Sequence, residues 1–208
     1  MSGDLRKRSQ YDGSRIVPMA DQLYLSYWLH GFTEDSMLRQ YEKMLRLFPY
    51  SRLARQGPVF RIIPIDFNQP AVFEQAYGSD FDINPALAAA KDFQHADSCY
   101  VLEALWDLWQ YDGDWHLAPA RAALCCYGPE FENETGENLR IEFGLEALFL
   151  PQPGIANNLR MAQSNIKSLL KLVHDLDDRL NPDRRLLASE SGGSFPEKLQ
   201  QALAQAEE

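Results

Sequence analysis

The hydrophobic and polar positions of residues 99–150 alternate with a period of two in three stretches. In the first stretch the even positions from Tyr100 to Leu108 are all apolar, while Glu103 and Asp107 stand at odd positions. Alternation of this kind predicts a strand with one buried face. Asp112 and Gly113 follow, a pair that adopts positive φ readily and therefore predicts a two-residue hairpin turn. The first stretch thus begins a β-meander.

The returning strand of the meander is expected from 115 to 128, and a second polar turn at 132–137 leads into a third antiparallel strand at 139–150. If Tyr111 pairs with Asp114, Trp109 lies opposite His116 on the face that points away from the core. Pro119 has no backbone N–H, so the sequence predicts a bulge or an edge position there.

Upstream of the meander, the same periodicities predict a strand, a helix, two strands and a helix. With the strand that begins at Cys99, this order is the βαββαβ pattern of ferredoxin-like folds. We therefore expect an α+β protein with an antiparallel sheet, extended by the meander and covered by helices mainly on one face. Pro64 indicates that its strand lies at an edge of the sheet. The predicted elements are strand 23–29, helix 34–48, strand 59–67, strand 71–77 and helix 84–93.

Downstream of the meander, apolar positions at helical spacing predict a long amphipathic helix that ends at Asn181-Pro182. We divide the chain into a disordered N-terminal tail at 1–17, one α+β domain at 18–188, and a flexible linker with a short helix at 189–208. That helix is too short to be stable alone. It docks on the body, docks on a partner, or frays.

Composition bounds the cellular setting and the class of partner. The 208 residues include 20 basic and 30 acidic residues, giving a formal net charge of −10. Such a chain repels the nucleic-acid backbone on average. There is no apolar run of ~18 residues and no visible secretory signal, so we expect no membrane contact and a cytoplasmic location. Three cysteines, two of them adjacent, do not form a disulfide framework.

Motifs for catalysis or cofactor binding are missing from the sequence. The four histidines are scattered over different predicted elements, and no zinc, calcium, phosphate-loop or nucleophile-elbow pattern occurs. Cys125 and Cys126 are neighbours on a strand, so their side chains point to opposite faces and suit small buried residues. We expect no catalytic residue, no metal and no cofactor.

Two surfaces are candidate sites. The first is the outward face of the meander with its turn, where carboxylates, an imidazole and indoles suit acid/base work or stacking of a ligand, although ordinary sheet packing also explains them. The second is acidic and suits a basic partner, although a solvated surface explains it as well. The first surface comprises Glu103, Asp107, Trp109, Tyr111, Asp114, Trp115 and His116, and the second comprises Glu130, Glu132, Glu134 and Glu137.

These observations favour a non-enzymatic interaction domain that binds another protein, of the inhibitor, immunity or complex-subunit type. The alternative is a small-ligand-binding protein or an enzyme that uses the Trp109 and His116 face. A concave pocket with convergent polar groups would favour the alternative, and a flat or helix-covered face would favour the interaction domain. The identity of the partner and the oligomeric state do not follow from the sequence.

Overall fold

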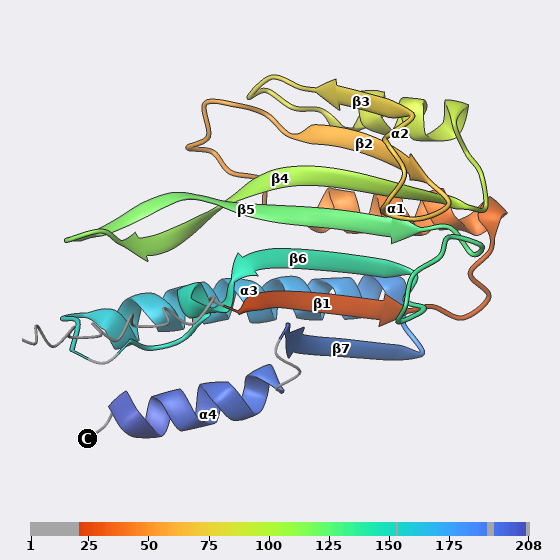
Figure 1. Ribbon diagram of the computed structural model, residues 1–208. Helices are drawn as coiled ribbons and strands as arrows, with labels where there is room; N and C mark the ends of the chain where they lie inside the picture. Colours follow the sequence, from red (N-terminus) through yellow and green to blue (C-terminus); the bar gives the residue numbers. More distant parts are fainter. Residues whose placement is uncertain (1–20, 153, 191–193, 207–208) are drawn as a thin grey trace, which may run out of the picture.

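The computed structural model describes residues 21–152, 154–190 and 194–206, so the tail predicted at 1–17 lies outside the described residues. Within them the chain forms one seven-stranded sheet and four α-helices (Figure 1). The elements are β1 (Gln22–Trp28), α1 (Glu34–Leu47), β2 (Val59–Pro64), β3 (Phe73–Ala76), α2 (Ile83–Asp92), β4 (Ser98–Tyr111), β5 (Trp115–Tyr127), β6 (Leu139–Leu145), the 3-10 helix η1 (Glu146–Phe149), α3 (Asn158–Leu180), β7 (Arg184–Ser189) and α4 (Phe195–Ala206).

The strand order is β3-β2-β4-β5-β6-β1-β7, and every neighbouring pair is antiparallel. This confirms the α+β class and the three-stranded meander. The ferredoxin-like order is wrong, because β4 is flanked by β2 and β5 and leaves no edge for β1. Instead β1 pairs with β6 and β7. The edge position expected from Pro64 is wrong as well, because β2 lies between β3 and β4. Period and turn signals identify strands one at a time, whereas the choice of partner depends on contacts between segments far apart in the chain.

Pro119 lies at an edge position without a bulge. The β4–β5 register runs unbroken from Cys99↔Tyr127 to Tyr111↔Trp115. The Leu105 carbonyl accepts a hydrogen bond from the Ser51 N–H at 2.7 Å. The odd-numbered residues of β4 therefore direct their backbone N–H and C=O groups away from β5. Pro119 lies opposite the odd-numbered Asp107, so its backbone nitrogen points away from β4. On that other side, β6 pairs with β5 only from Ala123 to Cys126. The missing N–H therefore removes no ladder hydrogen bond.

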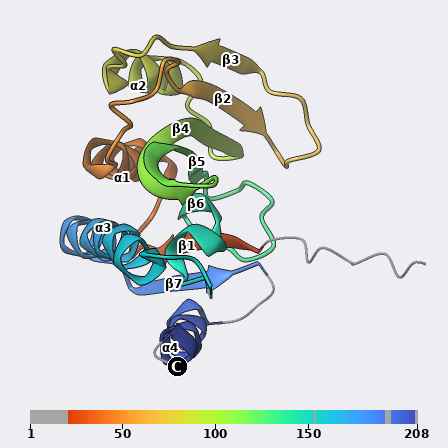
Figure 2. The same cartoon turned by 90° about the vertical axis from the view of Figure 1, so that its left-hand side faces the viewer.

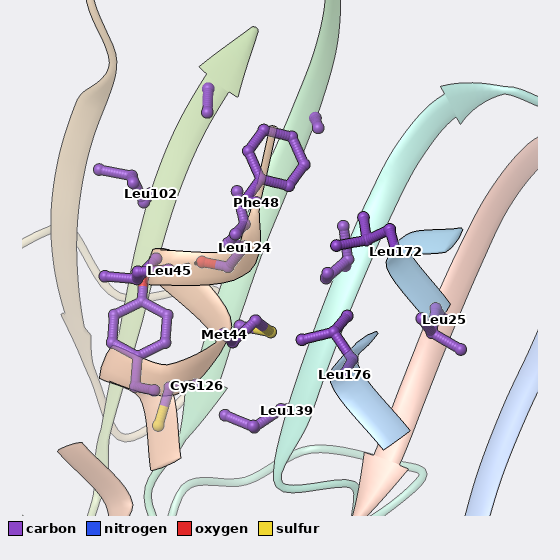
Figure 3. Packing of buried hydrophobic residues seen from close by; sticks show 14 of the residues in the cluster. Leu25, Met44, Leu45, Phe48, Leu102, Leu124, Cys126, Leu139, Leu172 and Leu176 are labelled. Carbon is purple, nitrogen blue, oxygen red and sulfur yellow. Dashed lines mark hydrogen bonds between the residues drawn. The ribbon is translucent and has the colours of Figure 1, made fainter. Parts of the chain in front are cut away.

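The main core lies between one face of the sheet and the helices α1, α2 and α3 (Figure 2). Trp106 of β4 forms its aromatic centre, with rings of Phe48, Phe143 and Phe149 between 5.7 and 6.1 Å away. Around it, aliphatic side chains of α1 and α3 pack on the sheet (Figure 3). These include Met44 and Leu45 over Leu102, Leu124 and Cys126, and Leu172 and Leu176 near Leu25 and Leu139.

The opposite, helix-free face of the sheet is covered only in part. The β5–β6 connection folds over one end of it and buries a second, smaller core. Burial raises the pKa of each of the three cysteine thiols, so all three stay protonated at neutral pH and are poor nucleophiles. This smaller core consists of Cys99, Val101, Cys125, Tyr127 and Phe131.

The C-terminal segment docks on the body, which decides among the three alternatives for its helix. Strand β7, which the sequence patterns did not predict, pairs with β1 and ends at the buried Ser189. Phe195 at the start of α4 is 2% exposed and belongs to the main core. Lys198 adds ion pairs to Asp21 at 2.8 Å and to Glu146 at 3.0 Å. None of the described helices is both long and apolar enough to cross a bilayer.

Candidate functional site

The structure does not bring the predicted meander surface together. The loop between β4 and β5 has three residues, 112–114, so Tyr111 pairs with Trp115 rather than with Asp114. The pairing expected from the sequence is therefore wrong by one residue. Because side chains alternate with a period of two, His116 lies opposite Gln110, on the other face from Trp109.

The remaining residues of that surface have separate structural roles. Asp107 accepts hydrogen bonds from the Ser51 hydroxyl and from the Arg52 N–H, the latter at 2.8 Å, and so holds the segment after α1. At the exposed tip of the hairpin, the Trp115 ring packs at a tilt against the Tyr111 ring, with centroids 5.3 Å apart, and its Nε1 donates to the Ala156 carbonyl at 2.7 Å. Asp114 and His116 are also exposed there. No catalytic arrangement results.

A cleft does open on the helix-free face, beside the smaller core. Its volume is about 480 Å³, and Glu103 is the one residue of the predicted surface that lines it. Gly144 of β6 adopts φ +71° at a bulge opposite β1 and lies close to β5, where a Cβ on residue 144 would be 3.2 Å from the Arg121 carbonyl oxygen. Across the cleft, Gly57 approaches Gly78 so closely that a Cβ would lie 1.9 Å from the Gly78 carbonyl oxygen. Only glycine, which has no Cβ, allows this close approach of the two backbone segments beside the cleft.

Charged residues of both signs line the cleft. Glu103 forms an ion pair with Arg61, which also pairs with Glu74 at 2.5 Å. Glu142 projects from β6, and partial burial raises the pKa of its carboxyl group above the ordinary value. Arg121 projects from β5. Neither Arg121 nor Glu142 was predicted as a site residue, although both stand at outward positions of their strands. Their proximity depends on the register between β5 and β6, which the pattern of either strand alone does not reveal.

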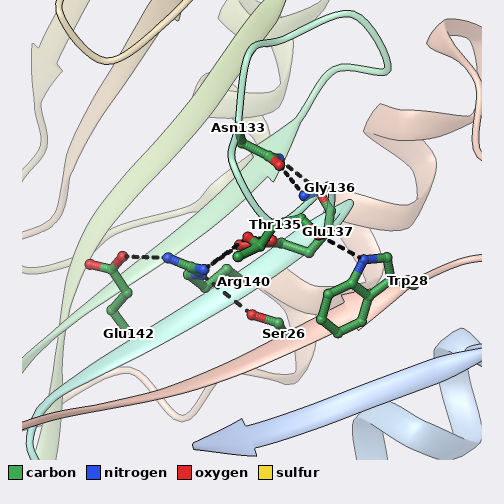
Figure 4. Close-up of polar contacts among 8 residues, drawn as sticks. All are labelled: Ser26, Trp28, Asn133, Thr135, Gly136, Glu137, Arg140 and Glu142. Carbon is green, nitrogen blue, oxygen red and sulfur yellow. Dashed lines mark hydrogen bonds and ion pairs between the residues drawn. The ribbon is translucent and has the colours of Figure 1, made fainter. Parts of the chain in front are cut away.

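A polar network borders the cleft on the β6 side (Figure 4). Glu137 is 2% exposed and forms an ion pair with Arg140 at 2.5 Å, while the Arg140 guanidinium lies 3.8 Å from Glu142. Arg140 also stacks on the Tyr24 ring at 4.8 Å and donates to the Ser26 hydroxyl at 3.3 Å. Glu137 is therefore a buried structural partner and does not belong to a solvated acidic surface.

The other three predicted acidic residues, Glu130, Glu132 and Glu134, are exposed on the β5–β6 connection. The Glu132 N–H donates to the carbonyl of Ile65 at 2.8 Å, and the Ile65 N–H donates to the carbonyl of Asp97 at 2.7 Å. These two bonds hold Ile65 at φ +66°, a left-handed conformation that is strained for a β-branched residue. The strain fixes an apolar side chain that is 47% exposed.

Ile65 belongs to a group of exposed apolar side chains at one end of the sheet, which we call the end patch. Phe67 is 55% exposed and its ring packs on Phe131 at 5.2 Å. Val72 and Phe93 are 55% and 44% exposed, and both line a hollow of about 370 Å³. The end patch consists of Ile65, Phe67, Val72 and Phe93.

Carboxylates surround the end patch, and we call them the acidic rim. Asp92 and Asp97 line the same hollow as Val72 and Phe93. An Asp97 carboxylate oxygen also lies 2.8 Å from Nδ1 of the His95 ring and accepts its proton in the Nδ1–H tautomer. The acidic rim consists of Asp66, Asp92, Asp97, Glu130 and Glu132. An apolar patch with a polar rim is typical of protein interaction surfaces. Sequence patterns could not reveal it, because exposed and buried apolar residues look alike.

In the described part of the chain, no three His, Cys, Asp or Glu side chains converge on a point where they could hold a metal ion. The two candidate sites on the described residues are the end patch with its acidic rim and the cleft. Comparison with family models, with curated proteins and with solved structures gives no match to this chain.

Proposed function

We propose that this chain is a protein-interaction domain whose end patch and acidic rim bind a partner with an apolar anchor among lysine and arginine side chains. The observation that carries the proposal is the end patch itself, four apolar side chains that are 44–55% exposed at one end of the sheet, two of which, Val72 and Phe93, line one hollow. Interface centres are typically apolar and desolvated, and polar rims surround them.

The strain at Ile65 supports an interaction role. A left-handed conformation of a β-branched residue costs roughly 1–2 kcal/mol. Here the backbone is held by hydrogen bonds from two different connections, and the side chain does not fill the core. Strain without a packing benefit within the domain is understandable if the side chain has a partner outside it.

Charge supports a basic partner. The acidic rim places five carboxylates around the patch, of which Glu130 and Glu132 were already candidates from the sequence. Lys91 and His95 are the nearby exposed basic side chains. With a net charge of −10 for the chain, this end attracts a positively charged surface and speeds its encounter. An inhibitor or a subunit of an assembly fits this description.

The enzyme alternative on the Trp109 and His116 face has lost its geometric basis, because these side chains lie on opposite faces of the hairpin. The small-ligand alternative moves to the cleft. It rests on a separate set of residues.

Site-specific photo-crosslinking in extracts of the native host tests the proposal. Benzoylphenylalanine replaces Phe67 or Phe93 in the end patch, and Leu170, 53% exposed on α3, serves as the control position. We expect both patch positions to crosslink the same basic protein and position 170 not to do so. If all three positions capture the same proteins, or if position 170 alone captures one, the proposal is wrong.

A further inference from the structure

The cleft on the helix-free face is a second site, independent of the end patch. We propose that it binds a free α-amino acid with an apolar side chain, holding the ammonium group against Glu142 and the carboxylate against Arg121. The proposal does not rest on the protein-binding function, since no residue of the end patch lines the cleft.

The sheet register places the two charged side chains at the right separation. Ala123 of β5 pairs with Glu103 on one side and with Glu142 on the other. Arg121 stands two residues along β5 from Ala123, so it is the diagonal neighbour of Glu142, with Cα atoms ~7–8 Å apart. Between them the strand offers only the Ala123 methyl group. Room is therefore left for a small ligand between the carboxylate and the guanidinium.

The ion pairs of the cleft leave two charges incompletely compensated. Glu103 is held by Arg61, and Arg140 is held by Glu137 at 2.5 Å, well inside its 3.8 Å distance to Glu142. Among the ion pairs within the described part of the chain, none involves Arg121. The cleft thus presents one incompletely compensated carboxylate and one free guanidinium. The complementary ligand carries one cation and one anion.

The walls indicate the rest of the ligand. The volume of about 480 Å³ exceeds what an ammonium and a carboxylate on one carbon require. Val59 and Leu105 supply half-buried apolar surface, and Gln22 and Gln56 supply amides for further hydrogen bonds. Burial raises the pKa of Glu142, and a bound ammonium would offset that penalty by supplying the missing cation. An apolar side chain lying on Val59 and Leu105 completes the fit.

Binding of three probes separates this ligand class from weaker alternatives. The probes are L-leucine, isoamylamine, which lacks the carboxylate, and 4-methylpentanoate, which lacks the ammonium. Isothermal titration calorimetry on the full chain should show L-leucine binding at least about tenfold more tightly than either analogue, because each analogue leaves one charged group of the cleft without its partner.

Variants assign each charge to its residue. Arg121→Gln should weaken L-leucine about tenfold or more and leave isoamylamine unchanged, while Glu142→Gln should weaken L-leucine and leave 4-methylpentanoate unchanged. Arg121→Lys, which keeps the charge, should retain part of the affinity, and Arg160→Gln, exposed on α3, is the matched control. The thermal unfolding of each variant is recorded to establish that it is folded.

Three results would overturn the proposal. The first is no heat of binding for L-leucine at about 10 mM, far above the range of specific ligands. The second is equal affinity for all three probes, which indicates apolar contact only. The third is an unchanged L-leucine affinity in both cleft variants, which would mean that L-leucine binds without contacting Arg121 or Glu142. Photo-crosslinking at the end patch is unaffected by any of these results.

Discussion

Asn165 in α3 closes both backbone hydrogen bonds of Trp109 in β4. Its side-chain oxygen accepts from the Trp109 N–H at 2.9 Å, and its side-chain nitrogen donates to the Trp109 carbonyl at 2.9 Å and to the Leu148 carbonyl at 2.7 Å. Strand β2 pairs with β4 only as far as Glu103, so no strand lies beside Trp109 on that side. The Asn165 amide makes the two hydrogen bonds that a neighbouring strand would otherwise make with the Trp109 backbone. It ties α3, η1 and β4 together.

Replacing Asn165 by alanine should therefore destabilise the fold by about 3 kcal/mol, since the buried backbone groups of Trp109 and Leu148 lose their partners. Asn165→Asp keeps the acceptor but loses the donor and should be destabilised as well. Ser168→Ala, on the exposed side of the same helix, is the control and should change stability by less than ~0.5 kcal/mol. Urea unfolding measures all three. Equal stability of Asn165→Ala and the wild type would contradict this role.

The burial of Glu137 separates it from the exposed acids of the same connection. Glu137→Gln leaves Arg140 without its closest carboxylate, and breaking a largely buried ion pair should lower the free energy of unfolding by about 2–3 kcal/mol. Glu132→Gln removes a solvated charge and should change it by less than ~0.5 kcal/mol. Thermal and urea unfolding of the two variants provide the comparison. A similar decrease in the free energy of unfolding in both variants would show that the Glu137–Arg140 ion pair does not stabilise the fold.

The Glu142 carboxyl group should make stability depend on pH. Its pKa is raised in the folded state, so between 4.5 and the folded pKa the folded chain holds more protons than the unfolded chain, and stability falls as pH rises through this window. Glu142→Gln removes that penalty. The variant should unfold at a higher temperature than the wild type at pH 7, and the difference should vanish below pH 4.5.

Glu134→Gln, with an exposed carboxylate, is the matched control and should show no such pH-dependent gain. Because 40% of the Glu142 side chain is exposed, water screens the effect and it remains small. A Glu142→Gln variant that is less stable than the wild type at pH 7 would mean that attraction to Arg140 outweighs burial.

Docking of the C-terminal segment predicts that this segment contributes to stability. Phe195→Ala removes a ring that is 2% exposed in the main core and should cost about 3 kcal/mol. Leu203→Ala, on a half-buried position of α4, should cost less. Differential scanning calorimetry gives both values. An unchanged melting temperature for Phe195→Ala would show that α4 adds little to the body.

Several elements of this fold follow from local pattern, and several do not. The alternation from Tyr100 to Leu108 identifies a strand with one buried face, because side-chain direction along a strand depends only on neighbouring residues. The partner of β1 depends on contacts with β6 and β7, which no local pattern encodes. Strand β7 was missed because it is short and its first three residues, Arg184, Arg185 and Leu186, are exposed at the edge of the sheet.

The candidate site was less predictable than the fold. One additional loop residue at 112–114 moved His116 to the other face, a change that composition cannot show. Arg121 and Glu142 become diagonal neighbours only through the register between β5 and β6. Ile65 and Phe67 resemble core residues in the sequence, and their exposure follows from the route of the chain after β2. Glu130 and Glu132 were correctly expected to be exposed, and their role with a partner stays a prediction.

The most direct test of the protein-interaction function is the affinity for the protein captured at the end patch, measured by biolayer interferometry at two salt concentrations. Val72→Glu should weaken binding by about 30-fold, the effect of losing ~2 kcal/mol at an interface centre. Leu170→Glu should leave binding unchanged, and Glu132→Lys should slow association and reduce its salt dependence. Full affinity in Val72→Glu, with loss in Leu170→Glu, would contradict the end patch as the interface.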